Sequence, residues 1–160
     1  MNTKKILSTI ALVLGASSAA SAQTATQTVT FQVDAINQIA FSGSPSLVIN
    51  TATAGSAPTA ATASGSWAVT TNQSNAKITA QLNSAMPAGL TLTANVAAPT
   101  ASGSSAGAQT LSTTAVDVVS GLTKLAEGGM SVTYSLSATP AAGVVTSTTR
   151  TVTYTITGGN

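Results

Sequence analysis

The chain has 160 residues, of which 43% are hydrophobic by type, 3% aromatic and 5% charged, and its formal net charge is +2. It contains no Cys and no His, which excludes disulfides, thiolate metal sites and catalysis by a cysteine or histidine side chain. Because Lys and Arg are so few, an extended nucleic-acid-binding surface is also excluded.

The first 22 residues have the order of a secretory signal peptide. Lys4 and Lys5 precede an apolar run over residues 6–15, and small residues follow it, ending in Ala20-Ser21-Ala22. We therefore expect cleavage after Ala22, a single domain over residues 23–160, and a location in the periplasm, on the cell surface or outside the cell. No later stretch approaches the length of a membrane helix, so no membrane span is expected after signal cleavage.

Removal of the signal peptide would leave a mature chain whose formal side-chain charge is zero. Its charged residues are Lys77, Lys124, Arg150, Asp34, Asp117 and Glu127. A neutral surface has little long-range self-repulsion and tolerates close contact with copies of itself.

From residue 28 onward, apolar residues alternate with Thr, Ser, Asn and Gln, which is typical of half-buried antiparallel strands. The longer alternating runs cover residues 28–33, 78–83, 90–96, 132–138 and 151–157, and shorter candidate strands cover 36–41, 47–50, 66–71 and 116–119. Near Asp34 the apolar face slips by one residue, from Val33 to Ile36, which predicts a bulge or a break.

The connections between the predicted strands are recognised by their turn residues or by their low sequence complexity. Residues 42–45 predict a turn, residues 86–89 predict a hairpin loop between two strands, and residues 140–143 begin the link between the last two long strands. Residues 51–65 and 97–109 contain no large apolar residue and are expected to be long surface loops. Residues 122–127 are the one helix candidate, and the flanking glycines confine it to a turn or two.

Eight or nine short strands predict an all-β fold, an immunoglobulin-like antiparallel β-sandwich. Trp67 shares a strand face with Val69, which favours a core tryptophan over a sugar-stacking platform. Tyr134 and Tyr154 fall on the apolar faces of their strands, and we expect them at the core edge with their hydroxyls reaching solvent.

Catalytic chemistry is poorly supported. Ser and Thr are abundant, but a nucleophile needs a base. Without His, the remaining candidates are two lysines, Lys77 and Lys124, and three carboxylates, Asp34, Asp117 and Glu127. A calcium site would need clustered acids, and none exist in the sequence. We therefore expect no catalytic residue, no cofactor and no metal site. Lys77 with Asp117 or Glu127 and an Asn would suit a buried Lys–Asn crosslink, although lone charges in sandwiches are usually exposed. The Asn72-Gln73-Ser74 triplet matches the short glycosylation sequon.

Together with the export signal, three segments resemble a recurrent type of small secreted bacterial β-sandwich protein with no established role. They are residues 29–37, residues 86–92 and residues 150–156. More loosely, the mature chain is similar to pilin-like fibre subunits, although many of those have a disulfide and this chain has none. Some such subunits insert an alternating N-terminal strand into the sheet of the next subunit, and the resemblance implies residues 24–33 for that role. From the sequence we favour the alternative, in which residues 24–33 are the first strand of their own sheet.

The sequence thus predicts a secreted, non-enzymatic structural or cell-surface protein that associates with itself or with other surface proteins. The main alternative is an adhesion module that binds a carbohydrate or a protein. An enzyme that uses Ser and Lys is the third hypothesis.

Overall fold

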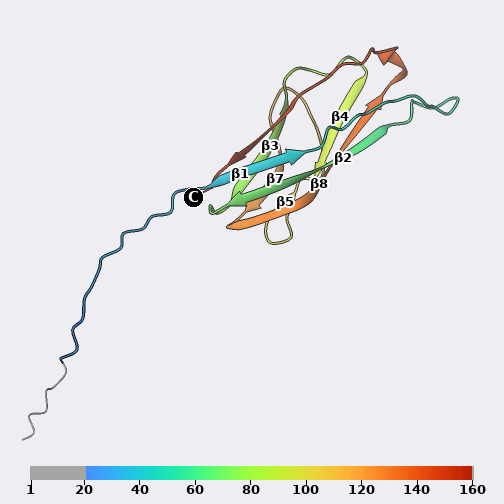
Figure 1. The fold of residues 1–160 in the computed structure, drawn as a ribbon. Coiled ribbons are helices and arrows are strands. Elements are labelled where there is room, and N and C mark those ends of the chain that lie inside the picture. Colours follow the sequence, from blue (N-terminus) through green and yellow to red (C-terminus); the bar gives the residue numbers. More distant parts are fainter. Residues whose placement is uncertain (1–20, 160) are drawn as a thin grey trace, which may run out of the picture. The chain divides into compact units, whose positions relative to one another are not determined.

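The computed structural model of the chain describes residues 21–159. The predicted signal peptide, except for Ser21 and Ala22, lies outside the described residues. Contacts divide the chain into two units at Gln32 and Val33. The second unit contains nine strands and a 3-10 turn, η1, over Pro140–Ala142 (Figure 1). The strands are β1 Asn37–Ser42, β2 Ala61–Thr71, β3 Ala76–Leu82, β4 Leu90–Val96, β5 Ser104–Ser105, β6 Ala108–Thr110, β7 Val116–Leu122, β8 Leu125–Ala138 and β9 Val152–Thr157.

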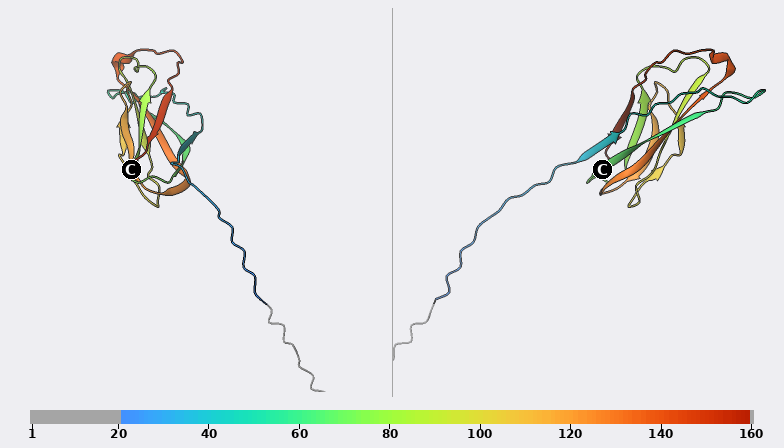
Figure 2. Two further views of the ribbon diagram at one scale, coloured as in Figure 1. Left: turned by 90° about the vertical axis from the view of Figure 1, so that its left-hand side faces the viewer. Right: turned by 45° about the vertical axis from the view of Figure 1, so that its right-hand side comes forward.

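The strands form two antiparallel sheets that face each other as two layers (Figure 2). One sheet has five strands in the order β1-β2-β8-β4-β6, and the other has four in the order β5-β7-β3-β9. Alternation directs the apolar face inward: in β3, Ile78 and Ala80 are buried whereas Lys77 and Gln81 are exposed. The predicted all-β class and β-sandwich architecture are confirmed.

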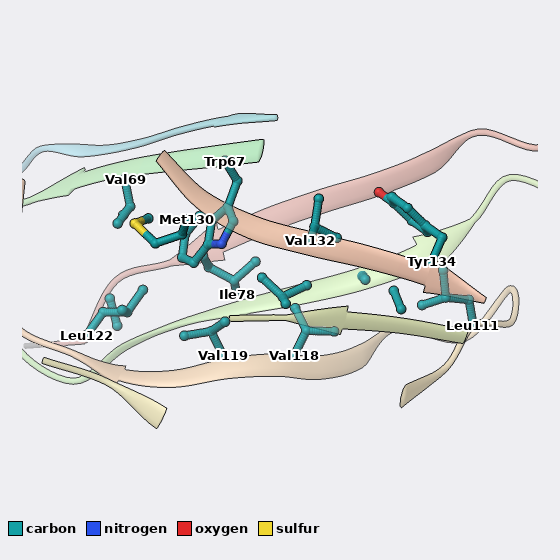
Figure 3. Packing of buried hydrophobic residues seen from close by; sticks show 14 of the residues in the cluster. Trp67, Val69, Ile78, Leu111, Val118, Val119, Leu122, Met130, Val132 and Tyr134 are labelled. Carbon is teal, nitrogen blue, oxygen red and sulfur yellow. The ribbon is translucent and has the colours of Figure 1, made fainter. Parts of the chain in front are cut away.

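The core lies between the two sheets and is centred on Trp67, which is 2% exposed (Figure 3). Its indole Nε1 donates a hydrogen bond to the carbonyl of Ala97 at 3.1 Å, so its one polar atom is satisfied. The Phe41 ring is stacked on the indole with 5.7 Å between centroids. The other large side chains with almost no exposure are Ile78, Leu122, Val96, Val118, Val119 and Val132. The prediction that Trp67 is a core residue is confirmed.

The predicted helical turn over residues 122–127 is wrong, because Leu122 ends β7 and residues 125–127 begin the 14-residue strand β8. Gly128 and Gly129, which were expected to confine this helical turn, lie inside β8. Between the pairs Trp67–Met130 and Val69–Glu127, β8 contains one more residue than β2, which is a β-bulge. Gly129 has φ +77° there, a conformation that glycine adopts without a steric penalty. Pairing of β8 with β2 and β4 therefore outweighs the local turn preference.

The low-complexity stretches are not entirely loops. Residues 61–65 belong to β2 and pair with β8, while the predicted strand over 47–50 is part of the long β1–β2 connection. Gly65 suits its position because a Cβ there would lie 2.6 Å from the Ser42 carbonyl oxygen. The stretch 97–109 contains β5 and begins β6. Residues 61–65 form a strand because the 14-residue β8 supplies their hydrogen-bond partners, and β5 and β6 pair with β7 and β4.

The predicted hairpin at residues 86–89 is also wrong. This turn leads from β3 in the four-stranded sheet to β4 in the five-stranded sheet. The link from β8 to β9 likewise passes between sheets. β3 and β4 do not pair with each other. β3 pairs with β7 and β9, and β4 pairs with β6 and β8, all of which lie further along the chain.

Candidate functional site

The segment over residues 24–33, which we call the leading segment, forms no strand in the structure. The expectation that it is the first strand of its own sheet is therefore wrong. Val29, Phe31 and Val33 are 71%, 89% and 78% exposed, and the Thr and Gln residues between them are exposed as well. The segment thus has the alternation of a half-buried strand, but its apolar face is in solvent.

The chain near Asp34, where the sequence predicts a bulge or a break, is hydrogen-bonded to Asn72. The Asn72 Nδ2 donates to the Asp34 carbonyl at 2.7 Å, and its Oδ1 accepts from the Ile36 amide at 2.8 Å. The neighbouring Thr71 hydroxyl donates to the side chain of Asn37, the first residue of β1, at 2.7 Å. The side-chain amide of Asn72, the first residue of the sequon, therefore holds the chain just before β1 begins.

Two six-residue strands at the sheet edges, β1 and β9, lack the features that usually protect an edge. Neither contains a charged residue or a proline. The other two edge strands, β5 and β6, have only two and three residues. β1 and β9 meet across the sandwich, where the rings of Phe41 and Tyr154 are stacked 3.7 Å apart. This side of the sandwich presents two long, uncharged edges.

A cavity of about 1070 Å³ opens between the sheets at one end of the sandwich. The β1–β2 connection, the β3–β4 turn and the β8–β9 link gather at this end (Figure 1). We call it the end cavity. Its walls include the side chains Phe41, Leu92, Tyr134, Leu136, Val152 and Tyr154, and its rim includes residues 45–52 and 145–150.

The hydroxyls of Tyr134 and Tyr154 are hydrogen-bonded to each other at 2.8 Å in the wall of the end cavity. Tyr134 is only 8% exposed, so the expectation that its hydroxyl reaches solvent is wrong. Burial raises the pKa of both tyrosines above the ordinary value, and their mutual hydrogen bond raises that of Tyr154 further. Both hydroxyls are therefore protonated at neutral pH, and this part of the wall is uncharged.

Arg150 is the one charged residue among the described residues that line the end cavity. Its Nε donates to the Ala85 carbonyl at 3.0 Å, and its Nη1 donates to the Thr149 carbonyl at 2.9 Å and to the Thr148 hydroxyl at 3.2 Å. Within residues 21–159, no carboxylate forms an ion pair with it. Its positive charge is thus held at the rim by neutral groups only.

The other charged side chains do not converge on one site. Lys77 forms a half-exposed ion pair with Asp117 at 3.0 Å, an arrangement unlike the buried environment of a Lys–Asn crosslink. Glu127 accepts hydrogen bonds from the amides of Thr100 and Ala101, and these bonds lower the pKa of its carboxyl. In the part of the chain that the structure describes, no group of three or more acidic residues gathers as a metal site would require. No helix among these residues has the length and apolarity to span a membrane.

No protein-family model matches the chain, and comparisons with curated proteins and with solved structures find no match. Two features therefore bear on function, the leading segment and the end cavity. The alternation of residues 28–33 predicted that the first of these can form a strand, although its favoured placement in the chain's own sheet is wrong. The second was missed, because its walls come from strands and loops whose arrangement the pattern of single segments does not specify.

Proposed function

We propose that the protein is a secreted, non-enzymatic structural protein whose copies associate through the leading segment. The observation that supports this most directly is the exposure of Val29, Phe31 and Val33 at alternate positions outside any sheet. An extended segment of this kind can pair with the edge strand of another sheet through backbone hydrogen bonds. Main-chain hydrogen bonds then supply affinity, and the alternate side chains supply fit.

The edges that would accept the segment are present in the same molecule. β1 and β9 each offer six residues with no charge and no proline, and the leading segment has no charged residue either. No like-charge repulsion opposes contact between them, because the mature chain has a formal side-chain charge of zero. One copy therefore carries both halves of a head-to-tail contact, which can extend into a fibre.

The number of apolar side chains in the leading segment sets the expected free energy of association. Three apolar side chains of this kind contribute of the order of 5–9 kcal/mol when fully buried. The loss of translational and rotational freedom offsets about 4 kcal/mol or more of this. Micromolar binding requires about 8 kcal/mol, so the main-chain hydrogen bonds must supply the remainder. We expect association that depends on protein concentration in the micromolar range.

Light scattering after size exclusion tests this proposal on the mature chain from residue 23. We expect multimers that grow with concentration, and a shift to monomer in the variant V29S/F31S/V33S. The matched control T26S/T28S/T30S changes three positions on the opposite face and should still associate. Equal association of both variants, or a monomeric wild type at every concentration, would contradict the proposal. Unchanged urea unfolding of both variants would show that the sandwich itself is intact.

A second candidate function is a binding module, and the end cavity is the observation that favours it. Trp67 is buried in the core and does not form a sugar-stacking platform, so the carbohydrate version of this candidate loses its main residue. A cavity of this volume, with apolar side chains on its strand walls, suits a small molecule instead.

A further inference from the structure

We propose that the end cavity binds a single-chain fatty-acid carboxylate, with the alkyl chain between the sheets and the carboxylate at Arg150. This inference develops the binding-module candidate and is independent of association through the leading segment. It rests on the size of the cavity, the chemistry of its walls and the position of its one charge.

The volume is too large for a packing defect. Protein interiors are close-packed, and voids larger than a water molecule are few. A space of about 1070 Å³ lies at the upper end of the range for small-molecule sites. The sandwich is therefore open at this end, in contrast to the closely packed region around Trp67.

The walls suit an alkyl chain better than a polyhydroxylated ligand. Phe41, Leu92, Leu136 and Val152 contribute apolar surface. The hydroxyls of Tyr134 and Tyr154 in the wall are already hydrogen-bonded to each other. Apart from these tyrosines, the one polar strand residue among the described residues of the lining is Ser42, whose hydroxyl is hydrogen-bonded to that of Ser66. The other Ser, Thr and Asn residues of the lining belong to the connections. A sugar between the sheets would therefore be desolvated without compensating hydrogen bonds from the strands.

The single charge at the rim selects an anionic head group. Nε and Nη1 of Arg150 bond to neutral oxygens, whereas Nη2 forms no hydrogen bond with the described residues. A guanidinium is well suited to a carboxylate, and the hydrogen bond between two charged groups is stronger than one between neutral groups. A peptide with the sequence of the leading segment has no charged residue and would leave Arg150 without an anion.

Isothermal titration calorimetry of the mature chain with dodecanoate, below its micelle-forming concentration, tests the proposal. We expect one binding site, with dodecanoate at least tenfold tighter than dodecanol and with dodecyltrimethylammonium weakest. Octanoate, which is four methylenes shorter, should bind about 200- to 300-fold more weakly, because each buried methylene is worth about fourfold in affinity. Equal binding of dodecanoate and dodecanol would overturn the role of Arg150, and no binding of either would overturn the site.

Variants at the rim and in the wall test whether the ligand lies in the end cavity. R150Q should weaken dodecanoate binding by about ten- to a hundredfold and leave dodecanol unchanged. The matched control K77Q removes a positive charge outside the cavity and should bind like the wild type. L136W puts a larger ring into the wall between the sheets and should weaken binding of both ligands, and L92F serves the same purpose if L136W fails to fold. Unchanged binding of both ligands by a folded wall variant would show that the site lies elsewhere and overturn the proposal.

Failure of this inference can be told apart from failure of the proposed association. The variant V29S/F31S/V33S should bind dodecanoate like the wild type even where it no longer forms multimers. Loss of dodecanoate binding in that variant would overturn the placement of the ligand in the end cavity.

Discussion

The hydroxyls of Tyr134 and Tyr154 lie 2.8 Å apart and join the two sheets, because Tyr134 belongs to β8 and Tyr154 to β9. This hydrogen bond spans the layers in the wall of the end cavity. Removing one of its two hydroxyls should therefore lower the free energy of unfolding.

Replacing one tyrosine of this pair by phenylalanine should lower the free energy of unfolding by more than half of the loss that both replacements cause together. Y134F or Y154F leaves one half-buried hydroxyl without its partner, which lowers the free energy of unfolding by about 1–3 kcal/mol. The double variant Y134F/Y154F removes both hydroxyls and should be no less stable than the single variants. Urea unfolding of the four proteins measures this coupling, and strictly additive losses would contradict it.

The raised pKa of both tyrosines makes the sandwich sensitive to alkali. A group whose pKa is higher in the folded than in the unfolded state stabilises the fold fully below its unfolded pKa. For tyrosine that value is 10.0, so the free energy of unfolding should decline as pH rises above it. Ultraviolet absorbance of tyrosinate should show both residues titrating above 10.0 in the folded protein. In Y134F/Y154F the alkaline decline should be reduced, and an unchanged decline would assign it to other groups.

Glu127 should link acid pH to the loop that contains residues 100–101. The hydrogen bonds from the amides of Thr100 and Ala101 lower the pKa of the Glu127 carboxyl below its ordinary value of 4.5. A lowered pKa means that these bonds contribute above pH 4.5 and are lost as pH falls through the folded pKa.

Hydrogen exchange of the two amides, followed by NMR, measures this effect. Their protection should fall on acidification in the wild type, relative to the intrinsic exchange rate. In E127Q the protection should be lower and independent of this titration. Equal protection in both proteins at neutral pH would contradict the role of Glu127.

The bulge in β8 predicts a difference between two adjacent glycines. Gly129 has φ +77° and no neighbour within 4 Å of an added Cβ, so G129A should destabilise through backbone strain alone, by about 1–2 kcal/mol. Gly128 lacks the positive φ, and an added Cβ would lie 3.4 Å from the Ala68 Cβ. G128A is the matched control and should cost less. A larger loss in G128A than in G129A would show that packing, not backbone conformation, decides this position.

Much of the sandwich could be predicted because alternation is a local property. Each run of apolar and hydroxyl residues indicates a strand and its inward face, and the placement of Trp67 in the core followed from one shared face with Val69. The pairing of strands could not be predicted in this way. The turn at residues 86–89 has suitable residues for a hairpin, but β3 and β4 find partners in different sheets. Gly128 and Gly129 resemble the end of a helix, yet they allow a bulge once β2 lies alongside.

The leading segment and the end cavity also differ in how far a local pattern predicts them. Alternation in residues 28–33 indicates a strand-forming segment but not which sheet completes it, and the structure leaves its apolar side chains exposed. The end cavity depends on how three connections are arranged around β4, β8 and β9. The position of Arg150 at its rim follows from that arrangement, and no motif around residue 150 indicates it.

Amide hydrogen exchange of residues 28–33 in dilute and in concentrated solution tests the central claim most directly. The claim is that the leading segment becomes a strand in a neighbouring copy. It predicts rapid exchange in dilute solution, and protection that rises with concentration together with the multimers seen by light scattering. Multimers in which residues 28–33 still exchange rapidly would contradict it.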